Sequence, residues 1–279
     1  MDIGRTIENI ISQGEINIKA KEGDFIGDNG LLYCGNCKTP KQVEVVLFDQ
    51  IRRPMCLCKC EIEKRDREEE ERKRQEFERK IKEYRRMGFP DSDMHDWTFE
   101  NDDHTNERIT KAMQNYVNNF SELRKQGKGL LLYGSVGTGK TYAACEVANA
   151  LIDRGYPVLV TNFARVLNTL QSTFEKQEYI DSLNRFQLLV IDDLGIERGT
   201  EFAKEQVYNV VDSRYRAGLP MIITTNLSID ELKSLKDIEA GRIYDRILER
   251  CFPIECSGTN RRRKAVRAGY DDMKALLGL

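Results

Sequence analysis

Short apolar runs alternate with helical patterns through the second half of the chain. The apolar runs are Gly129–Tyr133, Pro157–Thr161, Phe186–Ile191 and Leu219–Thr225. Runs of this length, bounded by turn-forming residues, are typical of buried strands. The helical patterns before, between and after them are Asn106–Gln126, Tyr142–Ile152, Phe163–Phe174, Glu201–Ala217 and Gly241–Arg250. This alternation predicts an α/β domain with a central parallel sheet flanked by helices.

A long charged segment precedes this domain. Residues Glu61–Arg86 are almost entirely Glu, Arg and Lys, and Phe77, Ile81 and Tyr84 recur among them at helical spacing. The pattern predicts a solvent-exposed helix with ion pairs between residues four apart. Such a helix serves either as a plain linker or as an arm that carries the part of the chain before it.

Cysteines gather ahead of the charged segment. Five of the eight lie between positions 34 and 60, namely Cys34, Cys37, Cys56, Cys58 and Cys60. The first two form a Cys-x-x-Cys knuckle, in which small turn residues let two thiolates meet at one ion. Four thiolates complete a tetrahedral zinc site, so we expect the ligands to be Cys34, Cys37, Cys58 and Cys60, with Cys56 as the alternate. An iron–sulfur cluster and reduced, unliganded cysteines remain alternatives.

The chain therefore divides into three expected parts. These are a small zinc-ribbon-like module over residues 1–60, a charged helical linker over 61–90 and the α/β domain over 91–279. Within the module, Gln42–Phe48 is expected to form a strand between the two groups of cysteines. A metal ion would supply much of the free energy that folds this module, because so short a segment buries little apolar surface.

The first apolar run of the α/β domain leads directly into a phosphate-binding loop. Its eight residues follow the pattern G-x-x-x-x-G-K-[ST] and are Gly134, Ser135, Val136, Gly137, Thr138, Gly139, Lys140 and Thr141. Backbone N–H groups of such a loop cradle phosphates, the lysine reaches the terminal phosphates and the hydroxyl ligates Mg²⁺. The order of strand, loop and helix predicts an ATP–Mg²⁺ site. The one tryptophan, Trp97, either packs in the core upstream or lies near the adenine base.

Polar side chains end the third and fourth apolar runs. Asp192 and Asp193 follow one run, and Asn226 follows the next. We expect Asp192 to hold Mg²⁺, directly or through water, and Asp193 to orient and deprotonate the attacking water. Many ATPases carry Glu at the second acidic position, and the shorter Asp favours slow hydrolysis. Asn226 either holds that water or the γ-phosphate, or simply forms a turn.

Two groups of basic residues lie near the C-terminus. Arg242, Arg246 and Arg250 share one face of the last expected helix, which is an ordinary solvated face in a monomer. In a ring of subunits, one of them can reach a neighbour's ATP as an arginine finger. The segment Asn260–Lys264, followed by Arg267, contacts nucleic-acid backbone, ATP phosphate or no specific partner.

Composition adds few constraints. The formal net charge of −2 gives no general argument for nucleic-acid binding, so any such surface must be local. No apolar run approaches the roughly 20 residues that span a bilayer. The segment Met1–Gly14 carries isoleucines in a short amphipathic helical pattern and lacks the features of a signal peptide. We therefore expect a cytoplasmic protein with no membrane partner and with reduced or metal-bound cysteines.

The order of these motifs resembles the AAA+ ATPases of the DnaC/IstB type, which include bacterial and phage helicase loaders and some transposition helpers. The resemblance covers about Trp97 to Lys264 and rests on Gly134–Thr141, Ile191–Gly195, Ile223–Ser228 and the segment Arg242–Arg246. It implies that Asn226 is the first sensor, that Arg246 is the arginine finger and that Arg261 is the nucleotide-binding second sensor. The cysteine module joined to a charged helix is similar to phage and prophage DnaC-like loaders.

The resemblance also implies a function. The helicase loaders of this type load a hexameric, DnaB-like replicative helicase in an ATP-dependent manner during DNA replication. They grip the helicase through the N-terminal module, engage single-stranded DNA and self-assemble into rings or spirals. The main alternative is an IstB-like ATPase that regulates DNA transposition. A small-molecule kinase and a non-enzymatic zinc-binding module with a decayed ATPase remain further alternatives.

Overall fold

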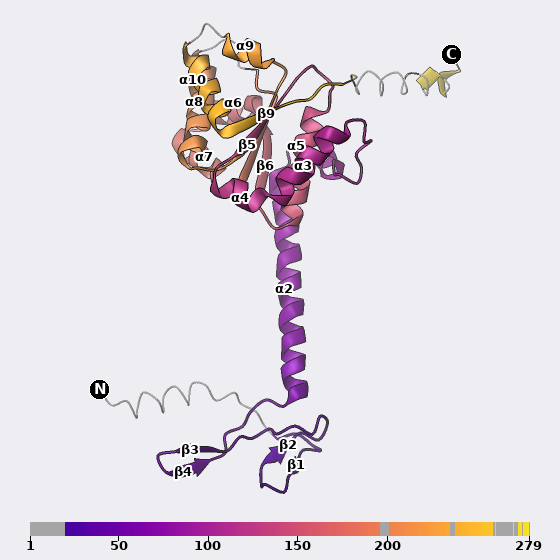
Figure 1. The fold of residues 1–279 in the computed structure, drawn as a ribbon, viewed down its shortest axis with the longest axis vertical. Coiled ribbons are helices and arrows are strands. Elements are labelled where there is room, and N and C mark those ends of the chain that lie inside the picture. Colours follow the sequence, from indigo (N-terminus) through magenta and orange to yellow (C-terminus); the bar gives the residue numbers. More distant parts are fainter. Residues whose placement is uncertain are drawn as a thin grey trace. The chain divides into compact units, whose positions relative to one another are not determined.

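The computed structural model describes residues 20–195, 201–234, 238–258, 260, 270, 273–274 and 276–278. The amphipathic pattern expected over Met1–Gly14 therefore lies outside the described residues. The chain separates into two compact units that meet within one long helix, after Phe77 (Figure 1). The expected division at residues 60 and 90 stays a prediction. Each unit is described below by itself.

The larger unit is built on a five-stranded sheet. Its strands are β5 (Gly129–Tyr133), β6 (Val158–Asn162), β7 (Leu188–Asp192), β8 (Met221–Thr225) and β9 (Cys251–Glu255). Their order across the sheet is β6-β7-β8-β5-β9, and every pairing is parallel. The predicted α/β fold with a central parallel sheet is confirmed. Because all five strands run the same way, their carboxyl ends meet at one edge of the sheet.

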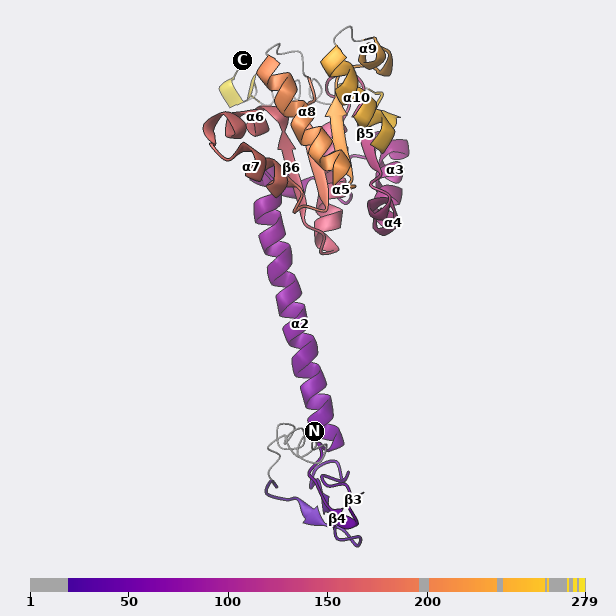
Figure 2. The same cartoon turned by 90° about the vertical axis from the view of Figure 1, so that its left-hand side faces the viewer.

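Helices cover both faces of this sheet. They are the 3₁₀ turn η1 (Ser92–Asp96), α3 (Glu107–Asn118), α4 (Phe120–Lys125), α5 (Lys140–Asp153), α6 (Phe163–Ser172), α7 (Lys176–Leu183), α8 (Glu201–Arg216), α9 (Ile229–Lys233) and α10 (Ile238–Arg250). Strand β5 divides its side chains between two cores, as its alternating geometry requires. Leu130 and Leu132 pack with α3 and α5, whereas Leu131 packs with α6, α8 and α10. Figure 2 shows α8 and α10 side by side on the second face.

Two elements differ from the sequence expectation. Strand β9 was not expected, because Pro253 interrupts its pattern and proline cannot donate to a sheet ladder. Among the described strands it lies at the edge of the sheet and pairs with β5 alone, so proline is tolerated there. The helix expected over Asn106–Gln126 divides at Asn119, whose backbone N–H caps the end of α3 by donating to the Asn115 carbonyl.

The smaller unit contains two short hairpins. Strands β1 (Phe25–Ile26) and β2 (Leu32–Tyr33) form one, and β3 (Val45–Leu47) and β4 (Gln50–Arg52) form the other. The strand expected over Gln42–Phe48 is shorter than predicted. It begins at Val45, and it ends at Leu47 because the chain turns at Phe48. Phe48 and Asp49 both adopt left-handed conformations, with φ of 51° and 59°. Two consecutive residues with positive φ make a tight hairpin turn that matches the twist of its strands.

The long helix α2 (Lys59–Gly88) begins in the smaller unit and ends in the larger one. Lys64–Glu68 and Glu69–Lys73 are ion pairs between residues four apart on its exposed surface, as the charge pattern predicts. No helix in the described part of the chain combines the length and the apolar character needed to cross a bilayer.

Gly129 gives a test of how tightly the sheet is built. A Cβ at this position would lie 1.8 Å from the Met221 carbonyl oxygen, so strands β5 and β8 would have to separate. We expect Gly129→Ala to lower the free energy of unfolding by about 3 kcal/mol or more in urea denaturation. Gly241→Ala on α10 is the matched control. It meets nothing within 4 Å and should change that free energy by less than about 1 kcal/mol. Equal effects of the two variants would contradict the close packing.

Candidate functional site

The phosphate-binding loop joins β5 to α5 at the carboxyl edge of the sheet. Gly139 ends the loop in a left-handed conformation, with φ of 90°, and is the N-cap residue of α5. A side chain at this position would be strained, which explains why the pattern requires glycine there. The Thr138 hydroxyl donates to the Ser135 carbonyl at 2.9 Å and closes the loop. The helix therefore points its unpaired N–H groups, and the positive end of its dipole, into the loop.

Lys140 extends from the first turn of α5 back into the loop and is only 7% exposed. Its ammonium group donates to the carbonyl oxygens of Gly134 and Ser135, each at 2.8 Å. A third bond, also 2.8 Å long, reaches the Asn226 side-chain oxygen at the end of β8. The buried cation is thus held between the loop and the neighbouring strand end.

Asp192 lies at the end of β7 and contacts the last residue of the phosphate-binding loop. Its Oδ1 accepts from the Thr141 hydroxyl at 2.8 Å and from the Thr224 hydroxyl at 2.6 Å. The Thr224 hydroxyl in turn accepts the backbone N–H of Asp193 at 2.8 Å. Thr224 is 1% exposed and had no expected role in the sequence. It fixes the positions of both acidic residues from the middle strand β8.

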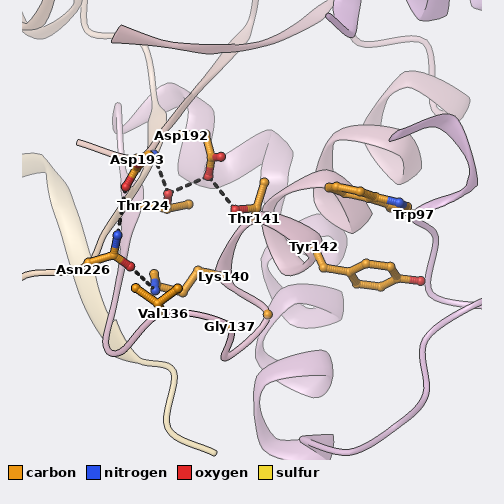
Figure 3. A pocket seen from close by; sticks show the side chains of 11 residues that line it. Trp97, Val136, Gly137, Lys140, Thr141, Tyr142, Asp192, Asp193, Thr224 and Asn226 are labelled. Carbon is orange, nitrogen blue, oxygen red and sulfur yellow. Dashed lines mark hydrogen bonds between the residues drawn. The ribbon is translucent and has the colours of Figure 1, made fainter. Parts of the chain in front are cut away.

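Asp193 completes the arrangement. It adopts a left-handed conformation with φ of 54°, which is uncommon outside glycine and is found at functional sites. Its carboxylate accepts from the Asn226 amide at 2.9 Å. A continuous set of hydrogen bonds therefore connects six residues, shown in Figure 3, namely Thr141, Asp192, Thr224, Asp193, Asn226 and Lys140.

These groups line a cavity of about 250 Å³. The Thr141 hydroxyl and the Asp192 carboxylate supply the oxygen ligands that Mg²⁺ prefers, and Lys140 supplies a cation for phosphate. The donor set therefore fits a magnesium nucleotide. Trp97 also lines the cavity, and its ring stacks on Tyr142 with centroids 5.7 Å apart. Trp97 also packs against the apolar core, as one of its two expected positions requires, and its place near the adenine base stays a prediction.

Arg246 lies apart from this cavity, on α10. Its guanidinium group forms an ion pair with Asp212 of α8 and lies over the rings of Tyr208 and Tyr215, 4.8 and 5.4 Å from their centroids. Arg250 lies over the same Tyr215 ring at 4.6 Å. The interpretation of this arginine face as ordinary solvated surface is therefore wrong for Arg246 and Arg250. It holds for Arg242, which is exposed.

Arg261, the expected second sensor, lies outside the described residues, and so do the other basic residues of its segment. The described chain just before it runs along the phosphate-binding loop. A Cβ on Gly137 would lie 2.2 Å from the Asn260 side-chain oxygen, and a Cβ on Gly134 would lie 2.5 Å from the Cys256 carbonyl oxygen. The loop is therefore packed against a late part of the chain.

In the smaller unit, four cysteines converge. The sulfur atoms of Cys34, Cys37, Cys58 and Cys60 all lie within 4.8 Å of one another. Cys34 and Cys60 are 3.7 Å apart, and Cys58 and Cys60 are 3.3 Å apart, measured between Sγ atoms. Tetrahedral zinc with bonds of about 2.3 Å places its sulfur ligands about 3.8 Å apart. The thiol positions therefore fit a tetrahedral metal ion.

Cys56 is not among these four. Its Sγ lies 3.6 Å from the Pro40 carbonyl oxygen instead. Within the group, the Thr39 hydroxyl bonds to the Cys37 sulfur at 3.1 Å and lowers the pKa of that thiol to about 5. The Lys59 N–H donates to the same hydroxyl and orients it. A thiolate is therefore favoured at Cys37, whereas burial raises the pKa of the Cys58 thiol.

Comparison with known families decides the class of protein. The protein family described as "IstB-like ATP binding protein" matches residues 64–268 of this chain. The chain belongs to this IstB-like family. Membership confirms the resemblance to DnaC/IstB-type AAA+ proteins and the class of P-loop ATPase. The match covers the phosphate-binding loop, both acidic residues and Asn226.

Several named proteins are similar to this IstB-like chain. The replicative helicase loader DnaI of Bacillus subtilis is 31% identical over 160 residues, which is 53% of this chain and 51% of DnaI. The replicative helicase loader DnaC of Escherichia coli is 29% identical over 144 residues, which is 50% of this chain and 56% of DnaC. The chain thus spans about half the length of the curated relatives it matches.

Solved structures agree on the fold. The crystal structure of DnaI covers 64% of this IstB-like chain and 98% of its own, with a TM-score of 0.54 and 24% identity. That of the DnaC helicase loader covers 60% of this chain and 100% of its own, with a TM-score of 0.52 and 21% identity. At these identities the likeness concerns the fold alone.

Thr224 gives a test of the hydrogen-bonded site. Thr224→Val keeps the shape of the side chain but removes its bonds to Asp192 and Asp193. We expect ATP hydrolysis to fall about tenfold, the worth of one good hydrogen bond, while ATP affinity changes less than about threefold.

Thr225→Val is the matched control, because the Thr225 hydroxyl is equally buried but donates to the Leu194 carbonyl. Steady-state hydrolysis and equilibrium binding of a fluorescent ATP analogue measure the two quantities. Equal hydrolysis rates for the two variants would show that Thr224 does not position the acidic residues.

Proposed function

We propose that the protein is an ATP-dependent loader of the replicative DNA helicase. The observation that supports this most is the pairing of a site that fits a magnesium nucleotide with a separate four-cysteine module that exposes apolar side chains. The relatives named as helicase loaders, DnaI and DnaC, point to the same client. The proposed setting is the cytoplasm, where unliganded cysteines stay reduced.

The nucleotide site binds ATP with Mg²⁺ and hydrolyses it. Backbone N–H groups of Gly134–Thr138 and the ammonium group of Lys140 hold the phosphates. The Thr141 hydroxyl and Asp192 hold Mg²⁺, which supplies positive charge at the reacting phosphate when bound. Asp193 orients the attacking water and accepts its proton, and Asn226 holds the same water or the γ-phosphate. The second sensor is assigned to Arg261 on the motif order alone.

Hydrolysis is expected to be slow. The Asp193 carboxylate is one methylene shorter than the Glu found in many ATPases. It is also held at 2.9 Å by the Asn226 amide, so it is not free to swing toward a distant water. Slow turnover suits a loader, which has to persist in its ATP-bound form until the helicase is on DNA.

The small module binds structural zinc and grips the helicase. Zinc is proposed to bind Cys34, Cys37, Cys58 and Cys60, whose four thiolates leave no open position for chemistry. The grip is assigned to the hairpin of β3 and β4. Val46 and Ile51 face each other across this hairpin and are 70% and 64% exposed, and Phe48 at its tip is 72% exposed. Exposed apolar side chains that gather on one small element are typical of an interface.

Single-stranded DNA is the second proposed partner. Phe174 lies in the loop between α6 and α7 and is fully exposed. A fully exposed aromatic ring is a platform on which a nucleotide base can stack, a contact worth about 1–3 kcal/mol. The overall charge gives no attraction, so DNA binding depends on such local contacts.

Self-assembly into a ring or spiral would complete the nucleotide site. Arg246 is proposed to reach the ATP of a neighbouring subunit as an arginine finger. In this chain Asp212, Tyr208 and Tyr215 hold its guanidinium group. Use of Arg246 by a neighbour therefore requires release from these three residues.

A transposition regulator of the IstB type is the second candidate, because the matching family is described as IstB-like. The nucleotide site fits either client equally well. The four-cysteine module favours the helicase, since a separate gripping module is a feature of loaders. A pull-down with the replicative helicase, compared with a pull-down with a transposase, separates the two.

The hairpin gives a direct test of the proposed client. We expect wild-type protein to form a complex with the replicative helicase of its source organism, detected by mass-resolved sizing with ATP. Ile51→Asp should weaken this complex at least tenfold, because it places a charge in the centre of the apolar contact.

Ile26→Asp on β1 is the control for that experiment. Ile26 is similarly exposed, at 66%, but lies on the other hairpin. The same loss in both variants would place the contact elsewhere on the module. Absence of any complex with wild-type protein would shift the proposal to the transposition regulator.

Subunit mixing tests the shared arginine. Lys140→Ala removes phosphate binding in one subunit, and Arg246→Ala removes the arginine in another. If sites are shared, a mixture should regain up to about one quarter of wild-type ATPase activity although each variant alone is inactive. Arg216→Ala is the control, because Arg216 is the exposed second partner of Asp212. This variant alone should keep its ATPase activity. Absence of rescue would indicate independent sites.

A further inference from the structure

Lys41 lies at the centre of the small module. It is 0% exposed, although lysine is rarely buried, and its backbone joins two parts of the module. Its N–H donates to the Leu32 carbonyl of β2, and its carbonyl accepts the N–H of Cys56. A buried ammonium group is costly unless it is paired. The two carboxylates that pair with it show what the lysine does.

The first carboxylate belongs to Asp24, whose side chain is 5% exposed. The Lys41 ammonium lies 2.8 Å from Asp24 Oδ2. The other oxygen of Asp24 accepts the backbone N–H of Gly35 at 3.1 Å. Gly35 stands inside the knuckle formed by Cys34 and Cys37. Asp24 therefore fastens Lys41 to the first pair of cysteines.

The second carboxylate belongs to Glu61, which is 16% exposed. Its Oε1 lies 3.6 Å from the Lys41 ammonium and 2.7 Å from the Lys21 ammonium. Its Oε2 accepts from the backbone N–H of Cys58 at 3.5 Å and contacts the Cys58 sulfur at 3.3 Å. Glu61 therefore fastens Lys41 to the second pair of cysteines, Cys58 and Cys60.

We propose that Asp24, Lys41 and Glu61 form a buried bridge that holds the two cysteine pairs at the spacing of a tetrahedral metal site. Lys41 is the positioning residue of this bridge and does not contact the metal. The inference rests on the metal binding by the four cysteines proposed above, and it names the residues that prepare this site.

The bridge is useful because the two cysteine pairs are far apart in the chain. Twenty residues separate Cys37 from Cys58, so bringing the pairs together costs conformational entropy, and the bridge meets part of this cost before the metal binds. Groups that orient metal ligands in this way typically change metal affinity by about 10–100-fold.

The test is zinc affinity of the full chain, measured by competition with a chromophoric chelator. Lys41→Met keeps most of the side-chain volume and removes the charge. We expect zinc affinity to fall about 10–100-fold. With saturating Co²⁺, the variant should keep the absorption bands of a four-thiolate tetrahedral site, because the ligands themselves remain. If Lys41 served only in folding, the Lys41→Met variant would lose these absorption bands.

Lys59→Met is the matched control. Lys59 stands between two of the ligands but its side chain is 71% exposed, and the variant makes the same change of charge. It should bind zinc as tightly as wild type. Equal affinity of Lys41→Met and wild type would overturn the bridge, whereas failure of wild type to bind zinc would overturn the metal site itself.

Two further variants cover the case in which Lys41→Met does not fold. Asp24→Asn and Glu61→Gln each weaken one arm of the bridge with almost no change in volume. Each should lower zinc affinity, and the losses should be less than additive in the double variant, because both arms act through Lys41. Unchanged zinc affinity in both single variants would overturn the proposal.

Discussion

The parallel pairing of β5, β7 and β8 is the constraint on which the nucleotide site depends. Parallel strands place their carboxyl ends at one edge, so the phosphate-binding loop, the two acidic residues and Asn226 leave the sheet side by side. The register aligns Tyr133 with Thr225 and Ile191 with Ile223, which fixes the levels at which the three segments emerge. Without this alignment, Lys140 and Asp193 could not share the Asn226 amide.

Much of this arrangement could be predicted from the sequence, because its signals are local. The phosphate-binding loop, the acidic pair and Asn226 each stand at the end of an apolar run, and parallel strand ends meet. Thr224 could not be recognised, since a threonine inside a strand is indistinguishable from an ordinary strand-forming residue. Strand β9 could not be predicted, because Pro253 interrupts its sequence pattern. The roles assigned to these residues stay predictions until they are measured.

The contacts of Arg246 could not be predicted either. Its partners Asp212, Tyr208 and Tyr215 lie on α8, and nothing in the spacing of α10 indicates which residues that helix meets. The cysteines show an intermediate case. Their number and grouping predict a metal site, but a choice between Cys56 and its neighbours depends on how the chain turns between positions 55 and 60. The structure brings together the four expected thiols and leaves Cys56 outside.

The packing of Arg246 has a consequence for how nucleotides would be distinguished. When Arg246 reaches toward a neighbouring subunit, its guanidinium group leaves one anion, Asp212, for another, the phosphate of the neighbour's nucleotide. The exchange is favourable only if the neighbour offers a more negative target, and the γ-phosphate is what ATP has and ADP lacks. Under the proposed arginine-finger role of Arg246, Asp212 would set the negative charge that a neighbour's nucleotide has to exceed, and Arg216, which also pairs with Asp212, would neutralise Asp212 afterwards. Assembly would then respond to the number of phosphates without any direct contact between Asp212 and the nucleotide.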